Sequence, residues 1–389
     1  MDPLVAALPW ALLCVWALVR LLPGPRLSTY PVRRRGHHAP HVSVIVPTNN
    51  DGHDIGACLG TILASEYPAL DVIVVDVGST DGTVEVAEAV AALSERVRVL
   101  AHERAPADWR ARAWECWSGA RAAEGELLLF THADTRHDPE LLPRAVAALE
   151  RRGAALVSVL PRHDLQTMAE RILLPHLLLT INARFVDARL VNRARSPRNA
   201  LANPQYLLVR RGAYFEAGGH DAVRERPAPE LGIAQRLRAL GRGVYLVHGE
   251  RFLVTRMFRS LSEISAGWTR ILAMGASTAL RSRLIATGPW IVGVLALAMW
   301  LVPPALTIFA WGSPLGPWAR YATGFSLVFW ALTYARHMQP VLFALTYPLG
   351  AIATAILYAR AALHPESGGA DSPRAEAARV GRVPDESAA

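Results

Sequence analysis

Short apolar runs separated by polar turns organise residues 41–255 into one folded region. His41–Pro47, Asp71–Asp76 and Glu126–Phe130 each contain a compact run of branched or bulky apolar side chains, which is typical of parallel strands buried on both faces. Stretches of helical spacing, such as Val84–Leu93, lie between them. Strands alternating with helices predict a doubly wound α/β domain, in which ligands bind at the carboxyl ends of the strands.

Longer apolar stretches flank this region. Leu4–Leu22 is interrupted only by Arg20, and a helix over it, at about 1.5 Å per residue, approaches the ~30 Å hydrocarbon core of a bilayer. We interpret residues 1–24 as an uncleaved membrane anchor, because an acidic start and a following Pro-Gly-Pro do not suit the alternative, a cleaved signal peptide. Residues 285–362 predict three further spanning helices, at Pro289–Trp311, Tyr321–Tyr334 and Val341–Tyr358.

Arginines at the ends of these stretches predict a topology. They lie after the anchor, before the first later helix and in the loop after the second: Arg20, Arg26, Arg33–Arg35, Arg281, Arg283 and Arg336. Positive loops remain inside, so we expect an integral protein of the cell membrane with the α/β domain in the cytoplasm. Residues 363–389 are rich in small and charged residues and predict a disordered tail.

Two stretches outside the predicted spans look amphipathic. Leu165–Val186, interrupted at Pro175, carries apolar residues among arginines and suits a pair of helices at the membrane interface, although an ordinary core helix has the same pattern. Residues 256–284 repeat apolar side chains at helical spacing around Trp268. A second interfacial helix is expected there.

Composition narrows the function classes. Hydrophobic residues make up 52% of the chain, and the net charge of +8 comes from arginine without any lysine. This charge reflects either a compositional bias or attraction to anionic headgroups and phosphorylated substrates. A nucleic-acid partner is not expected, since no aromatic-plus-basic pattern is present. Three scattered cysteines without a Cys-x-x-Cys pair argue against a disulfide framework and against a zinc site.

Polar residues follow the second predicted strand. Asp76 ends it, and a Gly-Ser-Thr turn comes next. The Asp76 carboxylate could bind a base or a ribose, and the turn at Gly78 and Ser79 offers backbone N–H groups. Alternatively, the polar side chains of this turn only cap the next helix.

A second polar segment, Thr131–Thr135, follows the strand at Glu126–Phe130. Asp134 could ligate a hard cation that also binds a diphosphate. His132 could add a nitrogen ligand for a softer ion such as Mn²⁺. The alternative is an exposed loop that leads into a helix.

These segments, in this order, resemble the family 2 glycosyltransferases of the GT-A fold, a Rossmann-like fold of nucleotide-diphospho-sugar transferases. The segments are Val-Ile-Val-Pro-Thr-Asn-Asn, Val-Asp-Val-Gly-Ser-Thr-Asp-Gly-Thr and Leu-Leu-Phe-Thr-His-Ala-Asp-Thr. More narrowly, the chain resembles the membrane-bound branch that glycosylates carotenoids, hopanoids or sphingolipids. That likeness rests on Trp-Arg-Ala-Arg-Ala-Trp at 109–114, Gly-Gly-His at 218–220 and Arg-Met-Phe-Arg-Ser at 256–260.

The resemblance covers roughly residues 41–270 and implies an inverting hexosyltransferase. Such an enzyme moves a sugar from a nucleotide-diphospho-sugar to a hydroxyl of a lipid-like acceptor at a membrane. Glu230 would be the catalytic base, and Asp134, with His132 beside it, would hold Mn²⁺ or Mg²⁺. Arg112 would contact the diphosphate. The full set implied to bind the donor is Pro47, Asp76, Gly78, Ser79, Arg112, Asp134, Gln205, Arg256 and Trp268.

Four motif positions depart from the family pattern. Val77 and His132 each stand where the family has an Asp, Pro204 where it has a Gly, and Pro229–Glu230 where it has Glu-Asp. These departures favour one alternative, a catalytically inactive relative that binds nucleotide-sugar or acts as a scaffold. A processive polysaccharide synthase is the other alternative, although no Gln-x-x-Arg-Trp motif is evident and few helices follow the domain.

Overall fold

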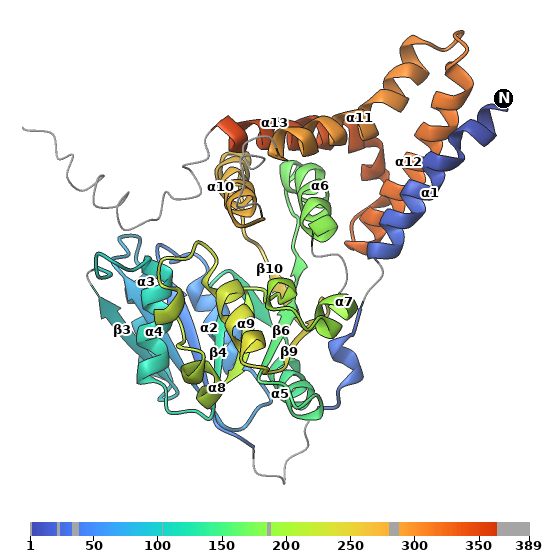
Figure 1. The fold of residues 1–389 in the computed structure, drawn as a ribbon. Coiled ribbons are helices and arrows are strands. Elements are labelled where there is room, and N and C mark those ends of the chain that lie inside the picture. The colour runs from blue at the N-terminus through green and yellow to red at the C-terminus, as the bar shows by residue number, and fades with distance from the viewer. Residues whose placement is uncertain are drawn as a thin grey trace, which may run out of the picture. The chain divides into compact units, whose positions relative to one another are not determined.

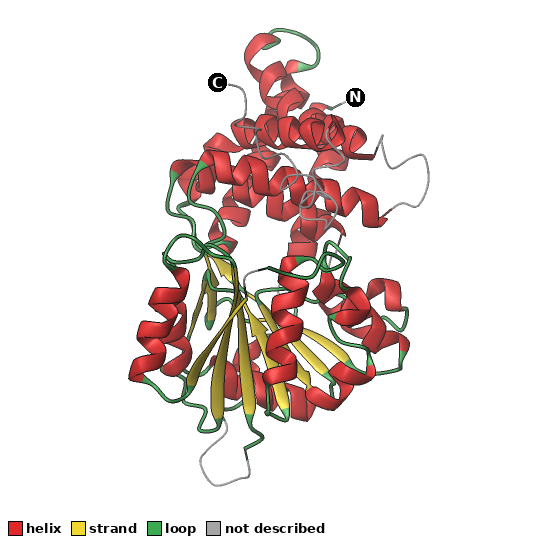
Figure 2. Ribbon diagram, turned by 90° about the vertical axis from the view of Figure 1, so that its left-hand side faces the viewer, coloured by secondary structure: helices red, strands yellow, loops and turns green. Residues whose placement is uncertain are grey.

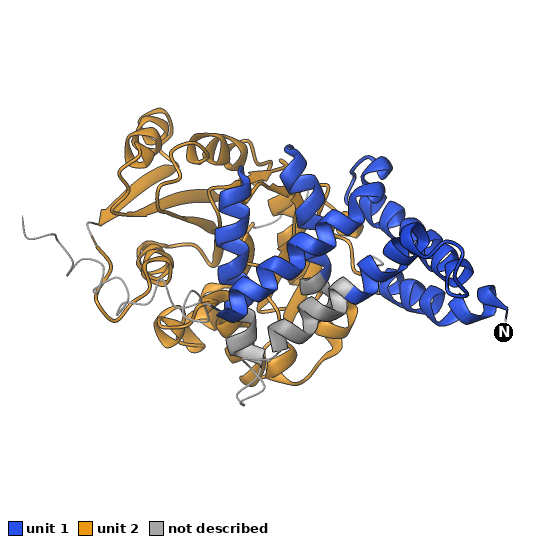
Figure 3. Ribbon diagram, turned by 90° about the horizontal axis from the view of Figure 1, so that it is seen from above, with its two compact units in different colours: residues 1–22, 164–187, 258–369 blue, residues 23–163, 188–257, 370–389 orange. Residues whose placement is uncertain are grey.

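The computed structural model describes residues 2–21, 24–32, 39–102, 104–184, 188–279 and 288–363. They form two compact units, drawn in different colours in Figure 3. The sheet unit is built from Pro23–His163 and Ala188–Met257. The helical unit is built from Met1–Leu22, Asp164–Asp187 and Phe258–Gly369.

A seven-stranded sheet in the order β3-β2-β1-β4-β8-β6-β9 forms the centre of the sheet unit (Figure 1). Strands β1 to β4 run in parallel, and β8 is antiparallel to both of its neighbours. The predicted strands at 41–47, 71–76 and 126–130 are confirmed as β1, β2 and β4. The strand bounds are β1 Val42–Thr48, β2 Leu70–Val77, β3 Val97–His102, β4 Leu127–Thr131, β6 Leu156–Leu160, β8 Tyr206–Arg210 and β9 Val244–His248.

Helices cover both faces of this sheet, as Figure 2 shows. Alternate side chains of β1 therefore enter different cores. Val44 and Val46 pack with α2 and α5, whereas Ile45 packs with α4, α8 and α9. Burial on both faces explains why these strands read as continuous apolar runs. The helix bounds are α2 Ile55–Leu63, α3 Thr83–Leu93, α4 Ala111–Ala122, α5 Leu141–Arg151, α7 Ala188–Arg193, α8 Arg211–Glu216 and α9 Pro229–Ala239.

Helix α4 approaches the sheet closely at Gly119. A Cβ atom there would lie 2.5 Å from Ile45 Cγ2 and 3.0 Å from Val75 Cγ2, so a larger residue would push the helix away. Because α4 connects two parallel strands, its N-terminus lies at their carboxyl ends. The first turns of α4, with Arg112 and Glu115, are thus placed at the edge where ligands bind in such sheets.

Among the described residues, the helical unit contains seven helical segments: α1 Pro3–Leu21, α6 Met168–Arg184, α10 Leu261–Ala279, α11 Gly288–Phe309, α12 Gly316–Arg336, η5 Val341–Thr346 and α13 Tyr347–Leu363. Within the described residues, one segment, Val341–Leu363, is long and apolar enough to cross a membrane. Pro3–Val19 and Ala298–Phe309 are shorter apolar helices. The expected anchor and the other two spans are therefore helical, but not shown to be spans. The expected tail after Leu363 lies outside the described residues, as do Arg33–Arg35, Arg281 and Arg283.

Helix α6 runs without interruption through Pro175, where the sequence predicted a pair of helices. Apolar side chains on both sides of this proline, including Leu173 and Leu177, lie in one cluster with Ile264 and Trp268 of α10. This shared packing accounts for the single helix, since it offsets the backbone hydrogen bond that a proline removes.

Candidate active site

Strands β1 and β4 separate at the carboxyl edge of the sheet. Their pairing ends at Ile45 and Phe130, while β1 continues to pair with β2 as far as Thr48 and Asp76. Pro47 lies in this stretch, where β1 no longer pairs with β4. No hydrogen bond to β4 is therefore lost because proline lacks an N–H group. The chain order also reverses between β1 and β4, the position at which doubly wound sheets bind ligands.

Asp76 holds the turn after β2. Its side chain is 2% exposed and accepts hydrogen bonds from the Thr48 hydroxyl (3.1 Å), the Ser79 N–H (3.0 Å) and the Ser79 hydroxyl (2.5 Å). Gly78 has a φ of +69°, a left-handed conformation that favours glycine. The structure thus brings these three predicted donor-binding residues together, with much of the Asp76 carboxylate engaged by the turn itself.

The capping role considered for this turn belongs mainly to Asp81. Its carboxylate accepts hydrogen bonds from the backbone N–H (3.1 Å) and the hydroxyl (2.5 Å) of Thr83, the first residue of α3. Ser79 instead accepts from the Asn50 N–H at 2.8 Å, in the loop after β1. The capping interpretation therefore holds for Asp81, and nucleoside binding at Asp76 stays a prediction.

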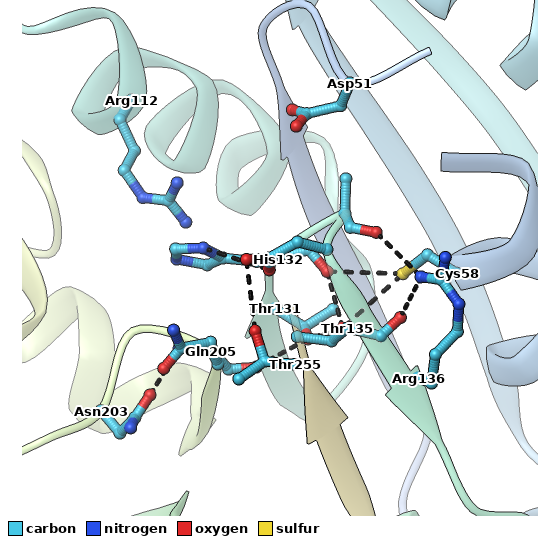
Figure 4. Close-up of polar contacts among 12 residues, drawn as sticks. Asp51, Cys58, Arg112, Thr131, His132, Thr135, Arg136, Asn203, Gln205 and Thr255 are labelled. Carbon is cyan, nitrogen blue, oxygen red and sulfur yellow. Dashed lines mark hydrogen bonds and ion pairs between the residues drawn. The ribbon is translucent and has the colours of Figure 1, made fainter. Parts of the chain in front are cut away.

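A buried polar network fixes the loop after β4 (Figure 4). The Thr131 hydroxyl donates to the Gln205 carbonyl (2.7 Å), and the Thr135 hydroxyl donates to the His132 carbonyl (2.6 Å). His137 Nε2 lies 3.1 and 3.0 Å from the two hydroxyl oxygens. Since both hydroxyl protons are already donated, His137 carries its proton on Nε2 and donates to these oxygens. Burial lowers the pKa of His137 to about 3, so the imidazole is neutral.

His132 and Asp134 lie together in this loop. The distance from His132 Nδ1 to Asp134 Oδ1 is 3.7 Å, and Asp134 Oδ2 accepts a hydrogen bond from the Thr255 hydroxyl at 3.2 Å. The Arg256 N–H donates to the Asp134 backbone carbonyl at 3.2 Å. Thr255 ends β10 (Leu253–Thr255), which pairs with β5 (Thr135–His137) and β7 (Arg162–His163) in a small second sheet.

Two buried atoms of this loop suit a metal ion. His132 Nε2 and Asp134 Oδ1 have no hydrogen-bond partner among the described residues. Burial, with a further effect of Arg112, holds the pKa of His132 well below its ordinary value, so the imidazole is neutral and one of its two nitrogens carries no proton. Burial raises the pKa of Asp134 to about 6. No cluster of three or more potential ligands occurs in the described part of the chain, so further ligands would have to come from a bound substrate.

Arg112 and Glu230 form an ion pair beside this loop. Arg112 Nε donates to Glu230 Oε1 at 3.2 Å, although 118 residues separate them in the sequence. Glu230 is 5% exposed and lies in the first turn of α9, where the helix dipole favours a carboxylate. Figure 4 shows Arg112 extending from α4 toward the His132 ring. The site therefore joins a cation, a carboxylate and two potential metal ligands.

Two of the remaining predicted residues, Gln205 and Trp268, are buried. Gln205 is 3% exposed and donates its backbone N–H to Asn203 Oδ1 at 2.8 Å. Trp268 is 1% exposed in a core of the helical unit, so the sheet unit by itself does not bring it to the others.

Sequence reasoning missed Asp51 and Glu115. Asp51 follows β1, and burial raises its pKa. Glu115 is 3% exposed on α4, with Oε1 lacking a hydrogen-bond partner among the described residues. The available signal was an acidic residue one helical turn before Gly119, on the face that packs against the sheet.

Known proteins resemble both the sequence and the fold. The profile described as Glycosyl transferase family 2 matches residues 43–207. A 4,4'-diaponeurosporenoate glycosyltransferase of Staphylococcus haemolyticus is 23% identical over 274 residues, covering 69% of this chain and 71% of that protein. The protein of the same name from Staphylococcus aureus is 26% identical over 261 residues, covering 66% and 67%.

Among solved structures, the mannosyltransferase PcManGT from Pyrobaculum calidifontis, in complex with GDP-Man and Mn²⁺, superimposes with a TM-score of 0.54 and 20% identity. The match covers 88% of this chain and 95% of that one, and it shows the GT-A fold. The order of motifs, the sheet and these relatives together identify residues 43–207 as a family 2 glycosyltransferase domain, and the chain as a glycosyltransferase.

Proposed function

We propose that this chain transfers a sugar, with inversion, from a nucleotide-diphospho-sugar to a hydroxyl of a lipid-like acceptor at a membrane. The observation that carries the proposal is the contact between Arg112 and Glu230 beside the loop of His132 and Asp134. A lipid-like acceptor is supported by the two staphylococcal relatives, which are named for a carotenoid-type substrate.

Arg112 offsets the negative charge that builds up on the departing nucleoside diphosphate. Its guanidinium has N–H donors beyond the one bonded to Glu230, so it can hold Glu230 and contact a phosphate together. Asp134 and His132 would hold Mn²⁺ or Mg²⁺ together with diphosphate oxygens. When bound, such an ion stabilises the same developing charge.

Glu230 removes the proton of the acceptor hydroxyl as its oxygen attacks the anomeric carbon. A single displacement of this kind inverts the anomeric centre. The contact with Arg112 keeps the carboxylate in one orientation and close to the diphosphate. Glu230 stands where the family pattern has the Asp of a Glu-Asp pair, and its side chain, longer by one methylene, extends from the start of α9.

The other predicted residues complete a donor pocket in this proposal. Asp76, Gly78 and Ser79 shape the turn that lies against the nucleoside, and Pro47 lines the gap between β1 and β4. Gln205 and Arg256 flank the loop of Asp134 through backbone contacts. For Trp268, on the predicted interfacial helix of residues 256–284, a role in donor binding stays a prediction from the resemblance.

The helical unit is proposed to anchor the enzyme, with residues 41–255 as a cytoplasmic catalytic domain. Support comes from large apolar side chains that this unit leaves exposed. Leu12 of α1 is 67% exposed, Phe309 of α11 is 87% exposed and Leu342 of η5 is 72% exposed. Extended apolar surface of this kind is unfavourable in water and suits a lipid environment. We therefore assign residues 1–24 and 285–362 to the membrane.

Glu230→Gln tests the proposal, because it keeps the size of the side chain and removes its proton affinity. Turnover should fall by roughly 10²- to 10⁴-fold, the usual contribution of a general base, while affinity for the donor changes little. The assay follows labelled sugar moving from a panel of nucleotide-sugars into a lipid extract. Glu225→Gln is the matched control, since Glu225 is an exposed acid just before α9.

Near-wild-type turnover in the Glu230→Gln variant would show that another acid is the catalytic base. A wild-type protein that binds nucleotide-sugar but transfers none to any acceptor would instead favour the inactive relative suggested by the motif departures.

A further inference from the structure

Glu115 occupies a defined place at the edge of the sheet. It lies one helical turn, about 5.4 Å, before Gly119 on the same face of α4, and Gly119 contacts Ile45 and Val75. Since α4 runs antiparallel to these strands, that step brings Glu115 roughly two strand residues further along, to the carboxyl ends of β1 and β2. Asp76 and Asp51 are close enough to raise the pKa of Glu115, which agrees with this placement.

One oxygen of the Glu115 carboxyl group is buried without a hydrogen-bond partner among the described residues. The side chain is 3% exposed, and Oε1 has no hydrogen-bond partner in the described part of the chain. A buried polar atom without a partner destabilises the fold, whereas an apolar side chain of similar size would not. Unsatisfied atoms of this kind are uncommon in native proteins and often mark ligand contacts.

The protonation state of Glu115 adds to this picture. Burial raises its pKa to about 8, against an opposing effect of Arg112 and with smaller contributions from Asp76 and Asp51. Cys116 is the other titratable neighbour on α4 whose pKa is linked to Glu115. At neutral pH the carboxyl group is therefore largely protonated, and it offers one O–H donor and one C=O acceptor.

We infer that Glu115 binds the nucleoside of the sugar donor, by hydrogen bonds to the base or the ribose. This inference rests on the proposed function, because it requires a nucleotide-diphospho-sugar as donor. The nucleoside is favoured over the diphosphate on two grounds. A neutral carboxyl group close to the Asp76 carboxylate offers a phosphate no positive charge, and Arg112, one turn nearer the start of α4, is the cation that suits it. Bases and riboses are uncharged and carry both donors and acceptors.

Two substitutions separate the roles of this side chain. Glu115→Gln keeps the shape, one acceptor and a donor, whereas Glu115→Leu keeps the approximate volume and removes both. Glu124→Leu is the matched control, because Glu124 is an exposed acid just after α4. Full-length protein in detergent is titrated calorimetrically with UDP and with GDP in the presence of Mn²⁺. Inorganic pyrophosphate with Mn²⁺ is the probe that lacks a nucleoside.

Glu115→Leu should weaken binding of the preferred nucleoside diphosphate by about threefold to thirtyfold at pH 7, as expected for one or two lost hydrogen bonds. Pyrophosphate binding should stay unchanged, and Glu115→Gln should remain close to wild type. Raising the pH from 7 to 9 ionises Glu115 and removes its donor. The wild type should then lose affinity relative to Glu115→Gln, which has no such proton to lose.

Every other result of these titrations overturns either the inference about Glu115 alone or the proposed function as well. An equal loss of nucleoside diphosphate and pyrophosphate in Glu115→Leu would assign Glu115 to the phosphate or metal site and overturn the inference. Unchanged nucleotide binding in this variant would overturn it as well, and the proposed function would stand. If Glu115→Leu does not fold, identical pH profiles of wild type and Glu115→Gln overturn it. A wild type that binds no nucleoside diphosphate refutes both proposals.

Discussion

A double-mutant cycle on Arg112 and Glu230 measures how strongly the centre of the site is held together. Arg112→Gln leaves the Glu230 carboxylate, which is 5% exposed, without its charged partner. Two unit charges 3.2 Å apart attract by roughly 5 kcal/mol at an effective dielectric constant of about 20. The Arg112 side chain is 36% exposed, so water already weakens this attraction and offsets part of its loss. We expect Arg112→Gln to lower the free energy of unfolding by about 2–4 kcal/mol, near the usual range for breaking a buried pair.

Glu230→Gln should cost less, about 1 kcal/mol, because the half-exposed guanidinium rehydrates and the amide oxygen still accepts from Nε. The double variant removes both charges of this pair and leaves neither of them unpaired, so it should be no less stable than Arg112→Gln alone. The resulting coupling energy is about 1–3 kcal/mol. Urea unfolding of the detergent-solubilised chain, followed by tryptophan fluorescence, provides the values. Additive effects within about 0.5 kcal/mol would show that the contact does not hold Glu230, and the reasoning would fail.

Two further predictions concern the metal and the membrane. His132→Asp replaces a neutral nitrogen with a charged oxygen, so activity with Mg²⁺ should rise relative to activity with Mn²⁺. An unchanged ratio of the two activities would show that His132 is not a metal ligand. Full-length protein should stay in the membrane fraction during an alkaline carbonate wash, because the exposed apolar helices lie in lipid; release into the supernatant would contradict the proposed anchoring.

Much of the sheet could be predicted because its signals are local. The runs that became β1, β2 and β4 are apolar along their whole length, and only strands covered on both faces need that pattern. The turn after β2 was predicted in its position but not in its details. Whether Ser79 or Asp81 caps α3 depends on Asn50, and that residue approaches the turn only after β1 and β2 have paired.

Contacts across long separations could not be predicted from the residues alone. Arg112 and Glu230 meet because α4 and α9 pack on the same face of the sheet, and neither local sequence specifies its partner. The burial of Glu115 follows from the close approach at Gly119, a property of tertiary packing. In the helical unit, apolar runs located the helices, but the single helix through Pro175 depended on a core that α6 shares with α10.

The charges of the site argue that a cation arrives with the donor. One guanidinium, Arg112, acts on Asp51, Asp134 and Glu230, so it offsets only part of the charge of a diphosphate that brings at least two negative charges. A neutral His132 where the family has an acid reduces the protein's attraction for a free ion. The unbonded atoms of His132 and Asp134 nevertheless offer two ligands to an ion already bound to phosphate. We therefore expect this enzyme to bind free Mn²⁺ weakly and the complex of Mn²⁺ with its nucleotide-sugar much more tightly, a difference that calorimetry with and without nucleotide can measure.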